Sequence, residues 1–465
     1  MNKVYVLFWF DVEDCTVTQS DDCAKRLCQI LTRHGVTGTM KLVGQKARML
    51  EQRVRYDVID ALQAHDIGFH SNWHGLRPQI AEYLGPLGME EGAAEFERRE
   101  APGLADVKRI FGEPVVTYGQ PGSNWAPQVF PVLRQWGIPT YVSGFGYIGV
   151  DCQPFYLGDT LCTSHMYGWR LSGEEQRHLM GLNFELGAPG ELAKHQALFS
   201  QSLRQLSDTG GLISIINHPC TLVLEEWFST NMKSRELTEA GFRHFEDFVQ
   251  WAVSHPNVEA IGASRLPELY PDHAVGRRFS SRDLLRLAEA LSEEINFVRV
   301  GDVTVSAAEA FQLLIEAFSA YAERQTFPPH VACAPVAGPP EGGPAAPQDF
   351  VVPWEEFRRN VRRVVQETRQ TGAVPATVPV SQLAVDPASY LAAVARLIVR
   401  VSQGSPPPEG IAIRPAPRRF EECVDQAAAE AAAKSVMMRP GFAAPRLYEL
   451  AKLLAWTAKP AVLQG

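Results

Sequence analysis

The chain has 465 residues, 45% of them hydrophobic, and a formal net charge of −9 at pH 7. A chain of this length buries sizeable cores and predicts two domains or more. Its acidic balance, without long basic runs, argues against nucleic acid or an anionic membrane as the main partner. The sequence has no run of about 18 apolar residues, so no membrane span is predicted.

The first predicted strand ends in a cluster of acids. VYVLFWF (4–10) is a continuous apolar run, typical of a strand covered on both faces, and Asp11, Glu13 and Asp14 follow it. Catalytic groups collect at the C-terminal ends of strands in α/β sheets. Strand alternation places Asp11 and Glu13 on one side and Asp14 on the other. Three carboxylates this close repel one another unless a cation lies among them, although a helix cap or loop cluster is the structural alternative.

Two histidines four residues apart follow another predicted helix and strand. The segment GFHSNWH contains His70 and His74. If residues 70–74 begin a helical turn, both imidazoles project from one face and can share a metal, with Ser71 free to cap or orient. Two imidazoles and one carboxylate leave a fourth position for water, which is the pattern of a catalytic zinc site. The spacing alone is a weak motif, and its position at a strand end strengthens it.

A third histidine ends another buried strand. In GLISIINHPC, His218 follows an apolar run and precedes a proline. Taken singly, such a histidine is more often a hydrogen-bonded core or turn residue. Together with the acid cluster and the histidine pair, it is interpreted as an acid or base. Together, the three segments contain the residue types that a hydrolase with one metal ion needs.

These three segments resemble the polysaccharide deacetylase superfamily, carbohydrate esterases that include chitooligosaccharide and peptidoglycan N-deacetylases. The resemblance covers about residues 3–272, and the His-Ser-x-x-His pattern is its most specific element. It implies a distorted (β/α) barrel, a divalent metal ion, most commonly Zn²⁺, and removal of acetyl groups from N- or O-acetylated saccharides.

Carried over by position, the resemblance implies Asp11 as general base, His218 as general acid, and His70 and His74 as metal ligands. The carboxylate ligand is open between two neighbours. Strand alternation and Asp-Val-Asp variants of the family motif favour Glu13, with Asp14 as the alternative.

The chain departs from the family pattern at two places. The later Asp-containing segment of the family has no match, since YVSGFGYIGVD carries Ser143 and Gly144 where it is expected. The Arg-x-Pro segment, whose arginine usually tunes the catalytic base, corresponds to Gly119-Gln120-Pro121, so the arginine is absent. Either other neighbours tune the base, or activity is low or lost. Four side chains are predicted to contact substrate, with core packing as the alternative for any one of the aromatic ones: Trp73, Trp125, Tyr118 and Gln120.

The order of predicted elements favours a barrel. Seven strand-like runs alternate with helical patterns and predict a parallel, closed or nearly closed sheet. The long stretch 144–210 is expected to include loops over the barrel mouth, and PFYLGDTLCTSHMYGWR (154–170) is interpreted as one of them. The predicted strands are residues 4–10, 37–43, 66–70, 114–118, 138–143, 212–217 and 258–263.

After residue 275 the sequence becomes mainly helical. We therefore predict two domains, 1–275 and 276–465, with a Pro/Gly-rich linker or loop at 333–352. A faint repeat at an offset of 80 residues relates GDVTVSAAEAFQLL to SQLAVDPASYLAAV. Stacked helical repeats usually form a binding or dimerisation surface, so homo-oligomerisation through this part is an expectation.

The spacing of the cysteines indicates the redox state of the compartment in which the protein works. Eight cysteines form no Cys-x-x-Cys pair, so reduced thiols are expected. The first strand starts at once, without a charged and apolar leader, and we expect a cytoplasmic protein.

The sequence is compatible with three functions. The leading hypothesis is a metal-dependent deacetylase of an acetylated saccharide. The second is another C–N hydrolase acting on a small amide or ureide, as in allantoinase-like relatives. The third is a non-enzymatic carbohydrate-binding or scaffold protein, which the missing arginine permits. An open groove lined by aromatic residues suits a glycan, whereas a closed pocket suits a small molecule.

Overall fold

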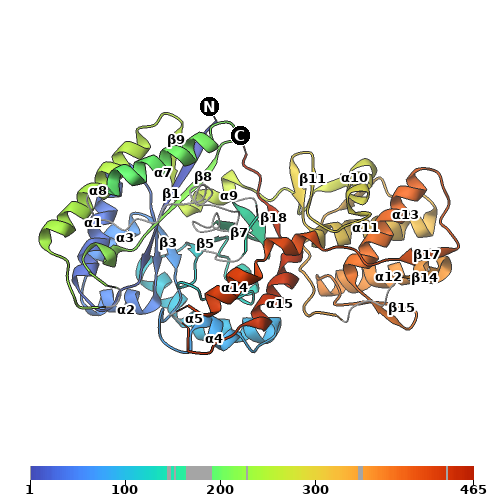
Figure 1. Ribbon diagram of the computed structural model, residues 1–465, viewed down its shortest axis with the longest axis horizontal. Coiled ribbons are helices and arrows are strands. Elements are labelled where there is room, and N and C mark those ends of the chain that lie inside the picture. Colours follow the sequence, from blue (N-terminus) through green and yellow to red (C-terminus); the bar gives the residue numbers. More distant parts are fainter. Residues whose placement is uncertain are drawn as a thin grey trace.

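The structure is a computed structural model in which the first lobe is a sheet surrounded by helices and the second is built of helices and short strands (Figure 1). It describes residues 2–143, 148–150, 153–163, 191–226, 229–343, 349–435 and 438–464.

The first lobe is built on one sheet that contains ten strands in the described ranges. They are β1 (Val4–Val12), β2 (Thr39–Leu42), β3 (Asp66–Phe69), β4 (Val115–Tyr118), β5 (Thr140–Val142), β6 (Phe155–Leu157), β7 (Thr160–Thr163), β8 (Gly211–Asn217), β9 (Val258–Ile261) and β18 (Lys459–Pro460). Their order is β18-β6-β7-β5-β4-β3-β2-β1-β8, and β9 pairs with the first half of β1. All pairs are parallel except that β6 is antiparallel to β7 and β18.

The sheet curls into a partly closed barrel. Leu7 and Trp9 of β1 belong to the same interior cluster as Val142 of β5, Leu161 of β7 and Ile216 of β8. Strands far apart along the pairing path therefore face a common core. Within the described residues the path ends at β8 and β18 without returning to itself. The predicted distorted barrel is confirmed, with β7 as an eighth parallel strand beyond the seven expected.

Helices cover the outer face of the sheet (Figure 1). Phe8 of β1 meets Phe245 and Phe248 edge to face, at centroid distances of 6.4 and 6.5 Å, so aromatic packing fixes one helix against the first strand. The helices of this lobe are α1 (Gln19–Arg33), α2 (Gly44–Gln52), α3 (Tyr56–Gln63), α4 (Ile80–Leu84), α5 (Met89–Phe111), α6 (Val129–Gln135), α7 (Glu191–Gln205), α8 (Arg235–Val253) and α9 (Leu266–Leu269).

The hairpin β6–β7 was expected to be loop, and that expectation is wrong. Its turn residues Gly158 and Asp159 have φ values of 54° and 61°. Two consecutive residues with positive φ form a turn whose backbone twist matches the twist of the two strands that it joins, which favours a tight hairpin over an open loop. The short runs FYL and TLCT on either side are buried, so a hairpin satisfies backbone groups that a loop would leave unpaired. The rest of the expected mouth loops, 164–190, lies outside the described residues.

The second lobe consists of two copies of one unit. Each copy runs strand, helix, hairpin, helix, strand, and its outer strands pair antiparallel. The first copy contains β10 (Arg278–Ser280), α10 (Ser281–Leu291), β11 (Val298–Val300), β12 (Val303–Val305), α11 (Ala307–Arg324) and β13 (His330–Ala332). The second contains β14 (Phe350–Pro353), α12 (Trp354–Thr371), β15 (Val378–Val380), β16 (Leu383–Val385), α13 (Pro387–Ser402) and β17 (Gly410–Ile413).

The two copies pack reciprocally. Helix α10 lies against α13, and α11 lies against α12, so each copy buries its helices on the other. The sequence repeat falls on the hairpin and following helix of each copy. Both of those helices begin at a side-chain cap, because Ser306 accepts a hydrogen bond from the Glu309 amide and Asp386 accepts one from the Ser389 amide. The domain boundary at residue 275 remains a prediction.

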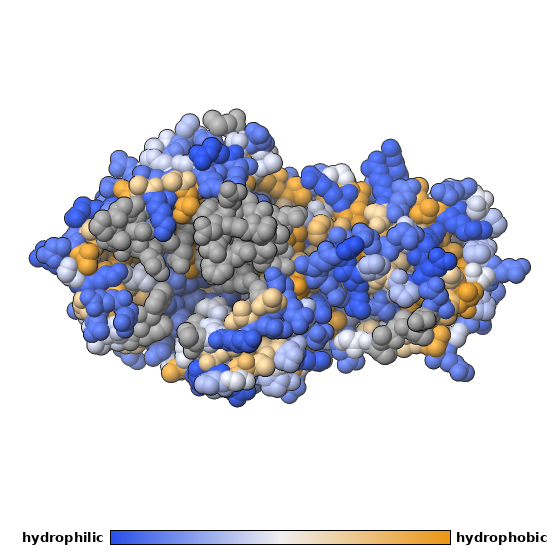
Figure 2. Space-filling view, viewed as in Figure 1, coloured by the Kyte–Doolittle hydropathy of each residue, from blue (hydrophilic) through white to orange (hydrophobic). Residues whose placement is uncertain are grey.

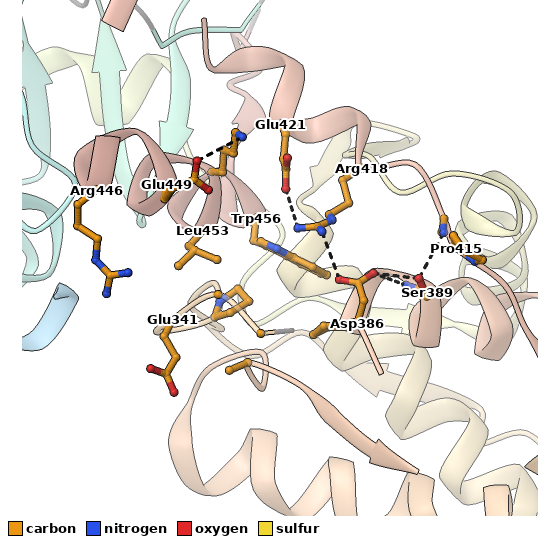
Figure 3. A pocket seen from close by; sticks show the side chains of 17 residues that line it. Glu341, Asp386, Ser389, Pro415, Arg418, Glu421, Arg446, Glu449, Leu453 and Trp456 are labelled. Atoms are coloured by element: carbon orange, nitrogen blue, oxygen red, sulfur yellow. Dashed lines mark hydrogen bonds and ion pairs between the residues drawn. The ribbon is translucent and has the colours of Figure 1, made fainter. Parts of the chain in front are cut away.

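The end of the chain returns to the first lobe. After β17 it forms α14 (Gln426–Ala433), α15 (Pro445–Leu454) and β18, which pairs with β6. A cavity of about 590 Å³ lies between α15 and the second lobe. Figure 3 shows Arg418 in its wall between Asp386 and Glu421, at 3.7 and 2.9 Å, so these charges already pair with one another.

The surface gives no sign of a membrane span. Within the described ranges, no helix is both long enough and apolar enough to cross a bilayer. Among the coloured residues of the face seen in Figure 2, hydrophilic ones predominate, with hydrophobic ones scattered among them.

A buried cation joins the two lobes. Lys459 of β18 is 3% exposed, and its Nζ lies 2.6 Å from Glu309 of α11 and 2.8 Å from Asp272, which follows α9. We expect Lys459→Met to lower the free energy of unfolding by about 3 to 5 kcal/mol, because it leaves two carboxylates without their buried partner. Chemical denaturation followed by circular dichroism measures the change.

The matched control is Lys452→Met on α15. That lysine is 27% exposed at its side chain and lies 3.7 Å from Glu449, so the same substitution should cost less than about 0.5 kcal/mol. Equal effects of the two substitutions would contradict a joining role for Lys459.

Candidate metal and catalytic site

The candidate site lies where parallel strands end at the same edge of the sheet. In the β1–β2 register, Asp11 lies beside Lys41. His70 directly follows β3, Gly119 follows β4 and His218 follows β8. Parallel pairing therefore brings together residues that are more than 200 positions apart in the sequence.

Glu13, His70 and His74 form one group of potential metal ligands. Glu13 Oε2 lies 2.7 Å from His74 Nε2 and 3.2 Å from His70 Nε2. The Glu13 side chain is 3% exposed, and the two imidazoles are 1% and 9% exposed. Burial opposes the charge of Glu13, but the two histidines outweigh it and hold its pKa below the usual range. One ligand atom from each residue lies within 4.8 Å of the others.

The backbone fixes the orientation of His70. Its Nδ1 lies 2.7 Å from the Gly119 carbonyl oxygen, which accepts a hydrogen bond from the imidazole N–H. Nε2, the ring nitrogen nearest Glu13, is then the atom that His70 can offer to a metal. A Cβ at residue 119 would lie 2.3 Å from the Val142 carbonyl oxygen and 2.4 Å from Lys41 Nζ, so only glycine fits there.

The loop that carries the second histidine is not helical. Ser71 and His74 have φ values of 71° and 35°, which a helical turn does not allow. The expectation of a helical turn at 70–74 is therefore wrong, although the two imidazole rings do meet, with centroids 5.4 Å apart. Ser71 Oγ accepts a hydrogen bond from the His74 amide at 3.1 Å, which matches its expected orienting role. Such left-handed conformations persist only when surrounding contacts hold them.

Asp11 lies beside this group and has three polar neighbours. Its Oδ1 is 2.8 Å from Lys41 Nζ and 3.6 Å from His70 Nδ1, and its Oδ2 is 3.3 Å from His218 Nε2. Burial disfavours the charged carboxylate. The interactions with His70, Lys41 and His218 outweigh burial and hold the pKa of Asp11 well below its ordinary value. Asp11 is therefore held in its ionised form, with the His218 imidazole within reach of its Oδ2.

Lys41 is the site residue that the sequence reasoning missed. It is 0% exposed, and its Nζ lies 4.1 Å from the centroid of the Trp9 ring. Burial lowers the pKa of this ammonium, while Asp11 opposes that shift. Its contact with Asp11 is an ion pair rather than an aligned hydrogen bond. A lysine within the apolar strand GTMKLV was the available signal, because a buried charge needs a partner.

Asp14, the alternative carboxylate ligand, has hydrogen-bond partners in the backbone. Asp14 Oδ1 and Oδ2 accept hydrogen bonds from the amides of Thr16 and Val17, at 3.2 and 3.3 Å, so its carboxylate is used in the loop before α1. Among the described residues, Asp14 belongs neither to the group of Glu13, His70 and His74 nor to the second group of potential ligands, Asp11, Glu13 and His218. Glu13 is therefore the carboxylate that the geometry offers to a metal.

The predicted substrate contacts separate into one exposed and three buried residues. Trp73 is 45% exposed beside His74. Tyr118 and Trp125 are 0% and 2% exposed and pack in the core, so neither offers a ring face to a sugar. Gln120 is also buried, donating to the Gly122 carbonyl and accepting from the Tyr141 hydroxyl at 2.6 Å.

The donor set fits a divalent cation. Two imidazole nitrogens and one carboxylate converge, and His70 is held in the required tautomer. Zn²⁺ takes nitrogen and oxygen ligands of this kind, three from the protein with further positions for water or substrate. Without a cation, burial of these groups must be offset by hydrogen bonds alone.

Known proteins resemble this chain in structure more than in sequence. No model of a protein family matches the sequence, and no curated protein matches it at a significant level. A candidate polysaccharide deacetylase from Mycobacterium smegmatis is 18% identical, with a TM-score of 0.38 over 57% of this chain and 90% of that one. An allantoinase is 13% identical, with a TM-score of 0.40 over 57% and 90%.

A further solved structure is the family 4 carbohydrate esterase of Streptomyces lividans in complex with acetate. It is 16% identical, with a TM-score of 0.28 over 56% of this chain and 92% of that one. These likenesses are low, so the function proposed below rests on this chain's own residues.

Metal binding separates the two candidate carboxylates. We expect wild-type protein to hold about one zinc per chain, and Glu13→Gln, His70→Ala and His74→Ala each to lose it. Asp14→Asn should keep zinc, because both carboxylate oxygens of Asp14 already accept hydrogen bonds from backbone amides. Elemental analysis of dialysed protein, with circular dichroism to check folding, measures this. Zinc retained in Glu13→Gln and lost in Asp14→Asn would reverse the assignment.

Proposed function

We propose that the chain is a metal-dependent hydrolase that removes acetyl groups from an N- or O-acetylated saccharide. The observation that carries this proposal is the convergence of Glu13, His70 and His74 directly beside the pair formed by Asp11 and His218. A divalent cation held by the first three residues would polarise a carbonyl oxygen and lower the pKa of water toward about 7. Zn²⁺ is the proposed ion.

Asp11 is proposed as the general base. Its carboxylate is ionised by its surroundings and borders the ligand group, so it can accept the proton of an attacking water. His218 is proposed as the general acid. Its Nε2 lies 3.3 Å from Asp11 Oδ2, and its side chain is 16% exposed, so it can receive a proton and donate it to the leaving amine or alcohol.

Lys41 is proposed to replace the missing arginine. The family resemblance places an arginine near the base, whereas here Gly119 stands at its position. The ammonium of Lys41 approaches Asp11 from β2, and the absence of a side chain at residue 119 leaves room for it. The base therefore has a cation beside it, which supports an active enzyme over a non-enzymatic scaffold.

The surroundings of Trp73 favour a saccharide over a small amide. A groove of about 510 Å³ is lined by Ser71, Trp73 and His74, and 45% of the surface of Trp73 is exposed. An exposed aromatic ring next to a reaction centre suits the apolar face of a sugar. A C–N hydrolase acting on a small amide or ureide is the second candidate, since Asp11 and His218 would serve that chemistry equally well.

Acetate release tests the reaction. Zinc-loaded wild-type protein should release acetate from acetylated chitooligosaccharides. Asp11→Asn should keep zinc and lower kcat by about 10²- to 10⁴-fold, because the base is lost while the ligands remain. Asp14→Asn is the control and should keep activity. Zinc binding without acetate release from this panel or from O-acetylated xylan would overturn the saccharide proposal.

The pH dependence tests the role of Lys41. Loss of its charge in Lys41→Met raises the pKa of Asp11, and the base must be deprotonated to act. The acid limb of kcat/KM against pH should therefore move to higher pH. Lys46→Met is the matched control, because Lys46 is also buried but pairs with Asp21, so its removal should leave the profile in place. An unshifted limb in Lys41→Met would contradict the proposed role.

A further inference from the structure

The groove beside the candidate metal site has its own chemical character. It lies between the loop that carries His74 and the helix α5, and its wall includes Trp73, Arg77, Arg98 and Arg99. His74 belongs both to the ligand group and to the groove. A molecule that reaches the metal site along this groove therefore passes these four side chains.

The loop side of the groove offers an apolar surface. Trp73 and Leu76 are 45% and 57% exposed, among the few large hydrophobic side chains exposed in the described part of the chain. The guanidinium of Arg48 lies 4.5 Å from the centroid of the Trp73 ring, which holds the ring in place. This surface suits a sugar ring.

The helix side of the groove is positively charged. Arg98 and Arg99 both pair with Glu95, at 2.7 and 2.6 Å, so one carboxylate outside the groove wall is shared by two guanidinium groups. Arg77 from the loop adds a third positive charge to the wall. The whole chain has a net charge of −9, so this positive surface is a local reversal of the overall charge.

The one acid among the lining residues, Glu100, already has hydrogen-bond partners in the protein. Glu100 is 5% exposed, and its carboxylate accepts hydrogen bonds from the Asn72 amide at 2.6 Å and the Tyr83 hydroxyl at 3.2 Å. Burial raises the pKa of Glu100 to about 7, so its negative charge is weakened at neutral pH. The lining residues thus carry three guanidinium groups and one carboxylate that is already hydrogen-bonded within the protein.

We propose that this groove binds an anionic group, phosphate or carboxylate, carried by the acetylated saccharide. The inference rests on the proposed function, because it places the acetyl group at the metal site and the anion beside the arginines. Guanidinium groups recognise both phosphate and carboxylate through paired hydrogen bonds. A sugar ring that lies between the metal site and the arginines can pack on Trp73. The substrate class is then an acetylated sugar phosphate or an acetylated acidic sugar, rather than a neutral glycan.

Binding of matched sugars tests the inference. N-acetylglucosamine, N-acetylglucosamine 1-phosphate and N-acetylmuramic acid are titrated calorimetrically into zinc-loaded protein at low and high salt. At least one anionic sugar should bind about threefold to tenfold more tightly than the neutral one, and less so at high salt, as expected for exposed arginines. Whether the phosphate, the carboxylate or both bind more tightly identifies the anion.

Substitutions test whether the arginines of the groove cause the preference for the anionic sugar. Arg77→Gln combined with Arg98→Gln should remove the preference and leave binding of the neutral sugar unchanged. Arg134→Gln is the control, because Arg134 is also exposed and ion-paired, to Asp159 at 2.9 Å, but lies outside the groove. Equal affinities of wild-type protein for all three sugars would overturn the inference, as would a preference retained in the double variant.

Acetate release on the same samples separates this inference from the function on which it rests. A preference for the anionic sugar without acetate release would support the groove and overturn the deacetylase. Acetate release with equal kcat/KM for neutral and anionic acetylated sugars would support the deacetylase and overturn the groove as an anion site.

Discussion

Two carboxylates buried at the edge of a parallel sheet are the constraint on which the rest of this site depends. Asp11 and Glu13 are each 5% exposed, and carboxylates removed from water need partners of opposite charge or hydrogen-bond donors. The partners come from three other strand ends, because parallel pairing brings Lys41, His70 and His218 to the same edge, where the carbonyl of residue 119 orients His70. A side chain added at residue 119 would push against both a carbonyl and the lysine, so backbone shape and charge are set together.

Much of the first lobe follows from local sequence. Apolar runs such as VYVLFWF fill strands buried on both faces, and the polar residues after them fall at the edge of the sheet. That logic is enough to predict that Asp11, His70 and His218 lie together. Strand alternation also favours Glu13 over Asp14 as the ligand, and the hydrogen bonds of Asp14 to two backbone amides agree with it.

Other features could not be derived in this way. The ion pair of Lys41 with Asp11 depends on strand register, which a single sequence does not state. Tyr118 and Trp125 lie among other aromatic rings, and aromatic residues near a motif look alike in sequence whether they face a ligand or the core. The reciprocal packing of the two copies in the second lobe left only a faint trace in the sequence, because these helices bury ordinary apolar side chains in the core. The link from Lys459 to Glu309 joins residues 150 positions apart and has no local signal.

The position of zinc in crystals of the loaded protein tests the central claim most directly. An anomalous difference map recorded at the zinc absorption edge should show one strong peak between Glu13 Oε2 and the Nε2 atoms of His70 and His74, with Asp11 and His218 beside it. A peak elsewhere, or none at this group in fully folded protein, would contradict the account, because these buried residues would then hold one another without a metal.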